Sequence, residues 1–321
     1  MSISRQLVSI GVPVYNEERY LRSTLNSLLS QDHENLELII SDNASTDGTA
    51  AICQEYARQD SRVRYYRNED NTGAVANFNR AFELSNGDYF MWAGAHDLWH
   101  SKFVSSALPL FEADSGLVLV YPRTMLIDPD GNELMMTPDE LDTRGLPALQ
   151  RYLKLVWTIH WCNMIHGLIR SSVVRSTSGF QNVWGSDILL LVELSLIGEF
   201  AQLPEVLFYR RENRQEANQN NLDGWKQRYL MTLEGSYNAR KTEASLQELF
   251  RELRNASLKV VSNSSLTYVQ KMRVYVETMV CFRMRYGVPC PADPIIRLVL
   301  TSRRTASLCK RLYSKIVQDT A

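Results

Sequence analysis

The sequence has little of what marks an exported or membrane-spanning protein. Its five cysteines are odd in number and scattered, and no Cys-x-x-Cys pair occurs among them. This pattern argues against a disulfide framework and a zinc site, and it indicates reduced thiols in a cytoplasmic protein. The longest apolar stretches, such as residues 188–197 with Glu193 inside, fall well short of the roughly 20 residues that a membrane span needs. The N-terminus lacks the features of a signal peptide.

An excess of charge of either sign is also missing. The 321 residues contain 35 Lys and Arg against 36 Asp and Glu, a formal net charge of -1. Without a global basic field, the sequence predicts no nucleic-acid partner. Apolar residues make up 45% and charged residues 22%, as in an ordinary globular protein. The length allows one large α/β domain with an appendage, or two domains.

Two phosphate-binding motifs are absent. No G-x-G-x-x-G follows the first apolar run, and no G-x-x-x-x-G-K-[S/T] occurs anywhere, so neither a dinucleotide fingerprint nor a phosphate loop is present. A nucleotidyltransferase is disfavoured because the first apolar run leads into residues 13–17 (PVYNE) and not into a loop rich in Gly, Lys and Arg.

The first two thirds of the chain alternate between two apolar patterns. Short β-branched runs predict strands, and apolar stripes at helical spacing between them predict helices. The predicted strands are 7–14, 36–40, 63–66, 89–92, 117–127 and 203–210, and the predicted helices are 18–31, 45–59 with Ser45 or Thr46 as N-cap, 73–84 and 101–112. Such alternation produces right-handed βαβ units, so we expect an α/β fold with a doubly wound, mostly parallel sheet.

The pattern changes beyond residue 210. Residues 211–221 are rich in Asn and Gln, which is typical of a loop. After this loop, helical spacing without strand alternation predicts helices at 225–240, 245–258, 266–285 and 294–316. We therefore divide the chain into an α/β domain of residues 1–221 and a helical C-terminal region of residues 222–321.

Polar residues follow the predicted strands. In a parallel sheet the ligand binds outside the carboxyl ends of the strands, so we expect residues 13–17, 41–43, 68–71 and 93–97 to line one cleft. Asp42 can accept hydrogen bonds there from a nucleobase or from ribose hydroxyls, or it can form an Asx turn with Asn43. We interpret Asp47 as a cap of the following helix.

Two of these segments, residues 12–17 (VPVYNE) and 40–49 (ISDNASTDGT), resemble those of family 2 glycosyltransferases of the GT-A fold. The resemblance runs from about Val8 to Arg210, because Asn71-Thr72-Gly73, Gly87-Asp88-Tyr89 and Tyr209-Arg210 follow in the family's order. It implies inverting transfer of a monosaccharide from a nucleotide-diphosphate sugar to a glycan or lipid-linked acceptor in polysaccharide biosynthesis. Residues 1–100 would then bind the nucleotide and residues 101–221 the acceptor. The implied donor contacts are Pro13, Tyr15, Asn16, Glu17, Asp42, Asn71, Ala95 and Arg210.

The family's DxD motif, which holds a divalent cation against the diphosphate, aligns here with Gly94 and His96. Only the following Asp97 remains of its acids, while Glu212 stands where the family keeps a His after Tyr209-Arg210. Since the leaving diphosphate must be neutralised, we expect a divalent cation, Mn²⁺ or Mg²⁺, held by His96, Asp97 and Glu212. Imidazole favours Mn²⁺ over Mg²⁺. The alternatives are that no metal binds, or that the protein holds a nucleotide sugar or a partner without turnover.

An inverting transfer also needs a general base that takes the proton of the acceptor hydroxyl. Asp187, at the head of an apolar helix, resembles the family's acid at this place, and the alternative is that it N-caps that helix. The resemblance further implies that His166, Gly167 and Trp184 shape the acceptor pocket. Tryptophan is more often a core residue.

The last predicted helix is basic and amphipathic, with Arg297, Arg303, Arg304, Lys310, Arg311 and Lys315 among leucines and isoleucine. Such a helix can lie on an anionic leaflet, which would suit a lipid-linked acceptor and a peripheral place on the inner face of the membrane. A packing helix with a solvated basic face is the alternative. The sequence leaves the oligomeric state open.

Overall fold

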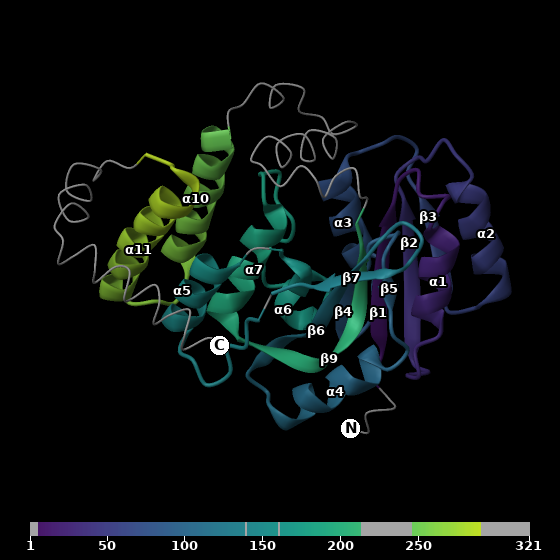
Figure 1. Cartoon of the computed structure of the whole chain (residues 1–321), viewed down its shortest axis with the longest axis horizontal. Helices are drawn as coiled ribbons and strands as arrows, with labels where there is room; N and C mark the ends of the chain where they lie inside the picture. Colours follow the sequence, from purple (N-terminus) through teal and green to yellow (C-terminus); the bar gives the residue numbers. More distant parts are fainter. Residues whose placement is uncertain (1–5, 139, 160, 213–245, 290–321) are drawn as a thin grey trace.

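The structure is a computed structural model that describes residues 6–138, 140–159, 161–212 and 246–289. Within these residues nine strands form one sheet in the order β3-β2-β1-β4-β8-β6-β9-β5, with β7 paired to β6 outside this path (Figure 1). The strands are β1 (Val8–Val14), β2 (Leu36–Asp42), β3 (Val63–Arg67), β4 (Tyr89–Trp92), β5 (Leu98–Trp99), β6 (Leu117–Ile127), β7 (Glu133–Met136), β8 (Leu168–Arg170) and β9 (Glu199–Arg211). The helices are α1 (Leu21–Leu29), α2 (Thr49–Gln59), α3 (Ala74–Glu83), α4 (Phe103–Ala113), α5 (Ala148–Thr158), the 3₁₀ helix η2 (Asn163–His166), α6 (Ser171–Val174), α7 (Ser186–Ile197), α10 (Leu246–Asn263) and α11 (Tyr268–Tyr286).

The predicted α/β architecture is confirmed. Strands β3, β2, β1 and β4 run parallel, as the alternation of strands and helices predicts. In the second half β6 and β9 are parallel, but β8 runs antiparallel to both β4 and β6. The edge strands β5 and β7 are antiparallel additions. The sequence did not predict them because two to four residues are too few to show a period of two.

The two faces of the sheet carry separate apolar cores, because successive side chains of a strand point to opposite faces. In β4, Tyr89 and Met91 belong to the core that β1 and β2 share with α1, α2 and α4. Phe90 and Trp92 belong to the other core, which includes residues of α5, α7, α10 and α11. Burial on both faces is the usual environment of parallel strands, and it leaves their ends as the places for polar chemistry.

The N-terminus of α2 differs from the prediction. The helix begins at Thr49 after Gly48, so neither Ser45 nor Thr46 is its N-cap. The Asp47 carboxylate accepts hydrogen bonds from the backbone N–H of Thr49 at 2.9 Å and of Glu18 at 3.2 Å. Asp47 therefore lies before the N-cap Gly48 and accepts from the first N–H group of α2, and its role as a helix cap stays a prediction. Ser45 and Thr46 bond the loop after β1.

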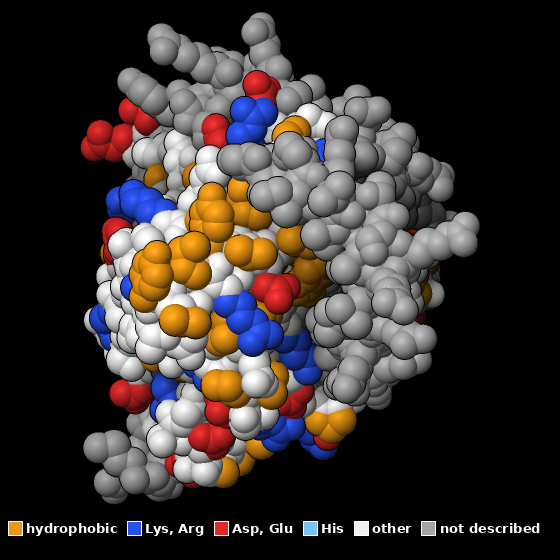
Figure 2. Space-filling view, turned by 90° about the vertical axis from the view of Figure 1, so that its left-hand side faces the viewer, with side chains coloured by type: hydrophobic (Ala, Val, Ile, Leu, Met, Phe, Trp, Pro, Cys, Tyr) orange, Lys and Arg blue, Asp and Glu red, His pale blue; other side chains and the backbone are white. Residues whose placement is uncertain are grey.

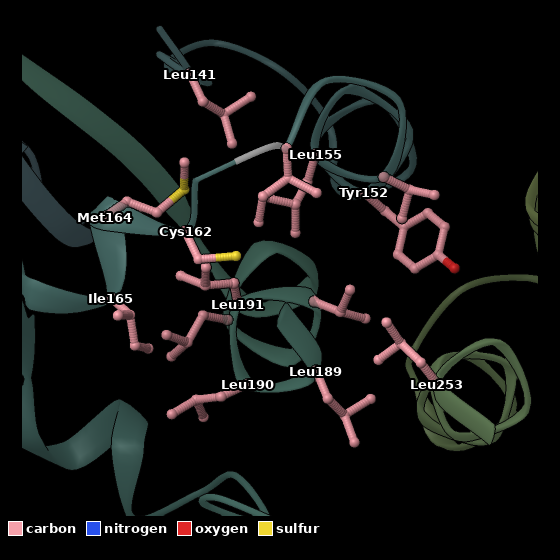
Figure 3. Close-up of a cluster of buried hydrophobic side chains, with 14 of the residues drawn as sticks. Leu141, Tyr152, Leu155, Cys162, Met164, Ile165, Leu189, Leu190, Leu191 and Leu253 are labelled. Carbon is pink, nitrogen blue, oxygen red and sulfur yellow. The ribbon is translucent and has the colours of Figure 1, made fainter. Parts of the chain in front are cut away.

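Helices α10 and α11 agree with two of the four predicted C-terminal helices and pack on α7 and α5. Figure 3 shows Leu253 of α10 beside Leu189 of α7 and Tyr152 of α5 in the same apolar cluster. This region therefore shares a core with the α/β domain, and the division at residue 221 stays a prediction. The other two predicted helices, 225–240 and 294–316, lie outside the described residues. None of the helices that the structure describes is long and apolar enough to cross a bilayer.

Candidate active site

Hydrogen bonds join the loops that follow β1 and β2. The side-chain Oδ1 of Asn16, a residue with a φ of 55° in the left-handed region that Asn tolerates, accepts from the backbone N–H of Thr46 at 2.7 Å. The backbone N–H groups of Asn16 and Glu17 donate to the hydroxyls of Ser45 at 3.0 Å and Thr49 at 2.8 Å. The two strand ends therefore meet at one edge of the sheet, as the sequence predicted.

Asp42, the last residue of β2, is fully buried. Its carboxylate accepts from the Ser45 backbone N–H at 2.8 Å, from the Tyr65 hydroxyl at 2.8 Å and from Arg67 Nη1 at 2.7 Å. Arg67 also donates to the Ser45 carbonyl at 2.8 Å. The carboxylate thus holds the loop after β2 in place, and its own atoms are enclosed by protein donors.

A second polar network holds the loop after β3. Asn43 Oδ1 accepts from Asn68 Nδ2 and from the Thr72 backbone N–H, each at 2.9 Å. Asn71 Oδ1 accepts from Asn43 Nδ2 at 2.6 Å and from the Gly73 backbone N–H at 2.9 Å. The Asn71 side chain is therefore occupied within the loop, and it fixes the start of α3.

The loop between β4 and β5 is anchored from two sides. The Thr24 hydroxyl of α1 lies within 3.0 Å of the carbonyl oxygens of both Ala95 and Asp97. On the other side, Asp97 Oδ1 accepts from the backbone N–H of Arg211, at the end of β9, at 2.8 Å. A Cβ atom on Gly94 would lie 2.6 Å from Asp97 Oδ2. Glycine at position 94 therefore gives the Asp97 carboxylate the room for this contact.

His96 lies in this loop between two carboxylates. Its Nδ1 is 3.2 Å from Glu17 Oε1, and its Nε2 is 4.0 Å from Asp97 Oδ1. Removal of water from around the ring lowers the pKa of His96, but the negative charges of Asp97 and Glu17 outweigh this and raise the pKa to about 9. The imidazole is therefore a cation at neutral pH, and 44% of its side chain is exposed.

Arg210 lies near the end of β9 and contacts the segment before β8. Its Nη1 donates to the Trp161 carbonyl at 3.2 Å and to Asn163 Oδ1 at 3.0 Å, and the guanidinium lies 5.6 Å from the Trp161 ring centroid. Arg210 Nη2 also pairs with Glu212 Oε1 at 3.3 Å. The end of β9 thus contacts the segment before β8 through Arg210 and the loop after β4 through Arg211.

The residues expected to bind a metal do not fit one. Glu17 and Asp97 lie at opposite ring nitrogens of His96, so an ion bound to one nitrogen would not reach the carboxylate at the other. Glu212 is buried and paired with Arg210. Among the described residues, no group of three or more His, Cys, Asp or Glu is placed to hold a metal ion. His96, Asp97 and Glu212 therefore do not form such a group in the described part of the chain, and a metal site at these residues stays a prediction.

Three expected donor contacts differ in accessibility. Tyr15 is 42% exposed at the sheet edge. Pro13 is buried inside β1 opposite Ser41, and Ala95 is only 3% exposed. Of these three, Tyr15 offers a side chain to a ligand.

His166 and Gly167 end the 3₁₀ helix beside β8. His166 Nδ1 lies 2.9 Å from the Trp92 carbonyl, and its ring packs beside Trp99 and Phe208. Burial lowers the pKa of His166, so the imidazole is neutral, and an Nδ1–H that donates to this carbonyl leaves Nε2 as an acceptor. A Cβ on Gly167 would lie 2.7 Å from the Val120 carbonyl oxygen, so this glycine serves close packing.

Asp187 lies in the first turn of α7, but Gly185 is the N-cap of that helix, so the capping alternative is wrong. Its carboxylate is half-buried and Oδ1 accepts from the adjacent Ile188 backbone N–H at 2.8 Å. Trp184 is 7% exposed and packs edge-on against Phe250 of α10, with ring centroids 4.3 Å apart. We therefore assign Trp184 to the core and not to the acceptor pocket.

Sequence reasoning missed Arg67 and Asn163, and it did not predict the contact of Trp161 with Arg210. The sheet register pairs Arg67 directly with Asp42, so a parallel pairing of the second and third strands would have placed the two together. Trp161 and Asn163 lie in a turn without apolar periodicity, and their contact with Arg210 spans almost 50 residues of sequence. No local pattern indicates such a contact.

The mostly parallel sheet and the helices that flank it form a fold of the GT-A type. Residues 9–168 match the family described as "Glycosyl transferase family 2", and the chain belongs to this family. It is 33% identical to the "Putative teichuronic acid biosynthesis glycosyltransferase TuaG" of Bacillus subtilis over 130 residues. These residues cover 40% of this chain and 51% of that protein. It is 30% identical over 182 residues to the "Putative glycosyltransferase EpsE" of the same organism, covering 55% of this chain and 60% of that one. The chain spans about half the length of these and similar curated relatives.

Solved structures share the fold. Staphylococcus aureus TarS 1-349 in complex with UDP-GlcNAc superposes with a TM-score of 0.63 at 16% identity, covering 87% of this chain and 73% of that one. The mannosyltransferase PcManGT from Pyrobaculum calidifontis, in complex with GDP-Man and Mn²⁺, gives a TM-score of 0.50 at 14% identity, covering 98% and 88%. At these identities the likeness concerns the fold.

Proposed function

We propose that the protein is an inverting glycosyltransferase that moves a monosaccharide from a nucleotide-diphosphate sugar to a glycan or lipid-linked acceptor in polysaccharide biosynthesis. The observation that supports this most is the junction of the loop that follows β4 with the end of β9. Arg211 makes that junction, because its backbone N–H donates to Asp97 and its Nε donates to the His96 carbonyl at 3.0 Å. This junction lies at the carboxyl ends of the parallel strands, where open α/β sheets bind ligands.

The donor nucleotide binds, in this proposal, along the loops after β1, β2 and β3. Tyr15 is the exposed ring of this edge and can lie against a nucleobase. Asn16, Asp42 and Asn71 contribute by fixing the loops, because the side-chain oxygens of all three already accept hydrogen bonds from protein groups. Backbone groups of these loops then supply donors and acceptors to the base and the ribose.

The leaving diphosphate needs positive charge, because its negative charge grows as the glycosidic bond breaks. His96 and Arg210 are the cations that we propose for this role, with 44% and 29% of their side chains exposed. They belong to the two elements that Arg211 and Asp97 hold together. Mn²⁺ or Mg²⁺ takes no part in this proposal, because the carboxylates of Glu17, Asp97 and Glu212 are already paired with protein cations or amides.

The acceptor hydroxyl must lose a proton as its oxygen attacks the anomeric carbon with inversion. Asp187 is the general base in this proposal, since its half-buried carboxylate bonds a single backbone N–H within its own helix turn. His166 orients the acceptor, because a neutral imidazole with Nδ1–H held by a carbonyl can accept a hydroxyl proton at Nε2 in a hydrogen bond.

The test is a donor-turnover assay with purified full-length chain and a panel of uridine- and guanosine-diphosphate sugars, with and without a lipid-linked glycan extract. Release of nucleoside diphosphate that rises with acceptor supports transfer. Asp187→Asn should bind donor normally and turn over about 10²–10⁴-fold more slowly. Asn182→Asp, a charge change at an exposed residue of the preceding loop, serves as the control.

A second candidate is a protein that binds nucleotide sugar without turnover. The observation that favours it is the lack of a metal-ligand cluster among the described residues, at the place where the family's metal motif aligns. Donor binding by calorimetry with no turnover for any donor would select this function.

A further inference from the structure

Helix α11 carries apolar side chains on an inner face and on an adjacent outer face. Its inner face packs in the core through Val274, Cys281 and Phe282. A second set lies outside at i, i+1, i+4, i+7 and i+8, the spacing of one helical face. This outer stripe consists of Tyr268, Val269, Met272, Tyr275 and Val276, which are between 44% and 77% exposed.

The outer stripe is unlike the rest of this side of the molecule. Figure 2 shows apolar side chains gathered on the face that carries α10 and α11, with Lys and Arg side chains beside them. The exposed residues of the neighbouring α10 are polar, and they include Gln247, Arg251, Asn255 and Lys259. A helix that is apolar on both faces is normally covered on both, so the stripe is expected to contact something apolar.

The charged side chains that flank the stripe carry a net positive charge. They are Lys271 and Arg273, the latter 63% exposed and 3.9 Å from Glu277. Residues 290–321, which lie outside the described residues, contain six cations, Arg297, Arg303, Arg304, Lys310, Arg311 and Lys315, against two acids, Asp293 and Asp319. Apolar side chains and tyrosines among cations are the composition of a surface that binds an anionic bilayer.

We propose that the outer stripe of α11 docks on the surface of an anionic lipid bilayer. In this position Val269, Met272 and Val276 enter the boundary between headgroups and acyl chains, the tyrosine hydroxyls stay at headgroup level, and Arg273 meets lipid phosphates. A second copy of this chain fits less well. In a two-fold contact the same patch faces itself, which would bring the two copies of Arg273 and Lys271 together.

The geometry also relates the stripe to the candidate active site. The Arg285 side chain of α11 donates to the carbonyls of Val156 and Ile159 at the end of α5. The residues that follow include Trp161 and Asn163, which bond Arg210. Docking would thus hold the acceptor side of the site close to the membrane. The docking itself goes beyond the proposed function and does not depend on it.

The test is co-sedimentation of the full chain with vesicles of phosphatidylcholine alone, or of phosphatidylcholine and phosphatidylglycerol in equal parts. The double variant Met272→Glu with Val276→Glu places two charges in the stripe at exposed positions. The control, Gln247→Glu with Asn255→Glu, adds the same charge to exposed positions of α10. Circular dichroism and thermal melting check that each variant is folded, and Val269→Ser with Val276→Ser is the uncharged alternative.

We expect the wild type and the control to sediment with the anionic vesicles, and the stripe variant to need at least about tenfold more lipid for half-binding. The proposal is wrong if the wild type ignores anionic vesicles, or if control and stripe variants weaken equally, because charge alone would then govern binding. It is also wrong if light scattering shows a wild-type dimer that the stripe variant converts to monomer. In that case a second copy covers the stripe.

Discussion

Replacement of Asp42 by Asn tests how the loop after β2 is held. The change keeps the size of the side chain but removes the charge that faces Arg67, and it turns an NH₂ group toward donors. The fully buried carboxylate accepts three hydrogen bonds, so at least one of the donors from Ser45, Tyr65 and Arg67 loses its partner. An unsatisfied buried polar group costs about 1–3 kcal/mol, and a broken buried ion pair costs about 3–5 kcal/mol.

Arg67 keeps 41% of its side chain exposed, so water can solvate its charge once the carboxylate is gone. We therefore expect Asp42→Asn to lower the free energy of unfolding by about 2–3 kcal/mol, below the range of a fully buried pair. Urea denaturation measures this value. Tyr65→Phe, which removes one neutral hydrogen bond, should cost about 1 kcal/mol and is the matched control.

The same variants separate loop positioning from direct contact with the nucleotide. If Asp42 acts through the loop, Arg67→Gln should weaken uridine diphosphate binding about as much as Asp42→Asn, and the two changes should not add in the double variant. A loss of stability below about 0.5 kcal/mol for Asp42→Asn would refute the inferred network. Additive losses of nucleotide affinity would refute the positioning role.

Three further predictions concern the loop after β4. Donor turnover should persist in excess chelator, and activity that is lost with chelator and regained with Mn²⁺ would show that a metal is used. Because the pKa of His96 is raised to about 9 in the folded protein, its ion pairs stabilise the fold fully below about pH 6.5, and this contribution is lost as the pH rises through 9. His96→Gln should therefore lower the free energy of unfolding at pH 6, by less than about 1 kcal/mol because the pair is partly exposed, and should leave it unchanged at pH 10. An equal loss at both pH values would contradict this. Gly94→Ala should displace the Asp97 carboxylate and weaken nucleotide diphosphate binding, and a crystal structure of the variant with Asp97 in place would contradict it.

The sequence predicted the parallel half of the sheet well because that half is built from local patterns. Each of its strands is an apolar run that is followed by a helix with one apolar stripe, and the order of these elements determines the parallel pairing. The placing of polar residues at one edge followed from the same rule. The position of Asp42 at the end of β2 is an example.

Long-range contacts account for what the sequence did not predict. Whether Asp42 faces a ligand or Arg67 depends on the neighbouring strand, and the composition of the loop alone does not show it. Whether His96, Asp97 and Glu212 can bind one metal ion depends on contacts between residues far apart in sequence. The hydrogen bond from the Arg211 backbone N–H to Asp97 is one such contact. The core position of Trp184 depends on Phe250, which comes from α10, more than 60 residues further along the sequence.

Nuclear magnetic resonance of the transfer product tests most directly whether this chain is an inverting transferase. With an α-linked nucleotide-diphosphate sugar as donor, the new glycosidic bond should form with the β configuration in the first turnovers, and Asp187→Asn should slow its appearance. A product of α configuration, or a product formed equally fast by Asp187→Asn, would contradict inversion at this site with Asp187 as the base.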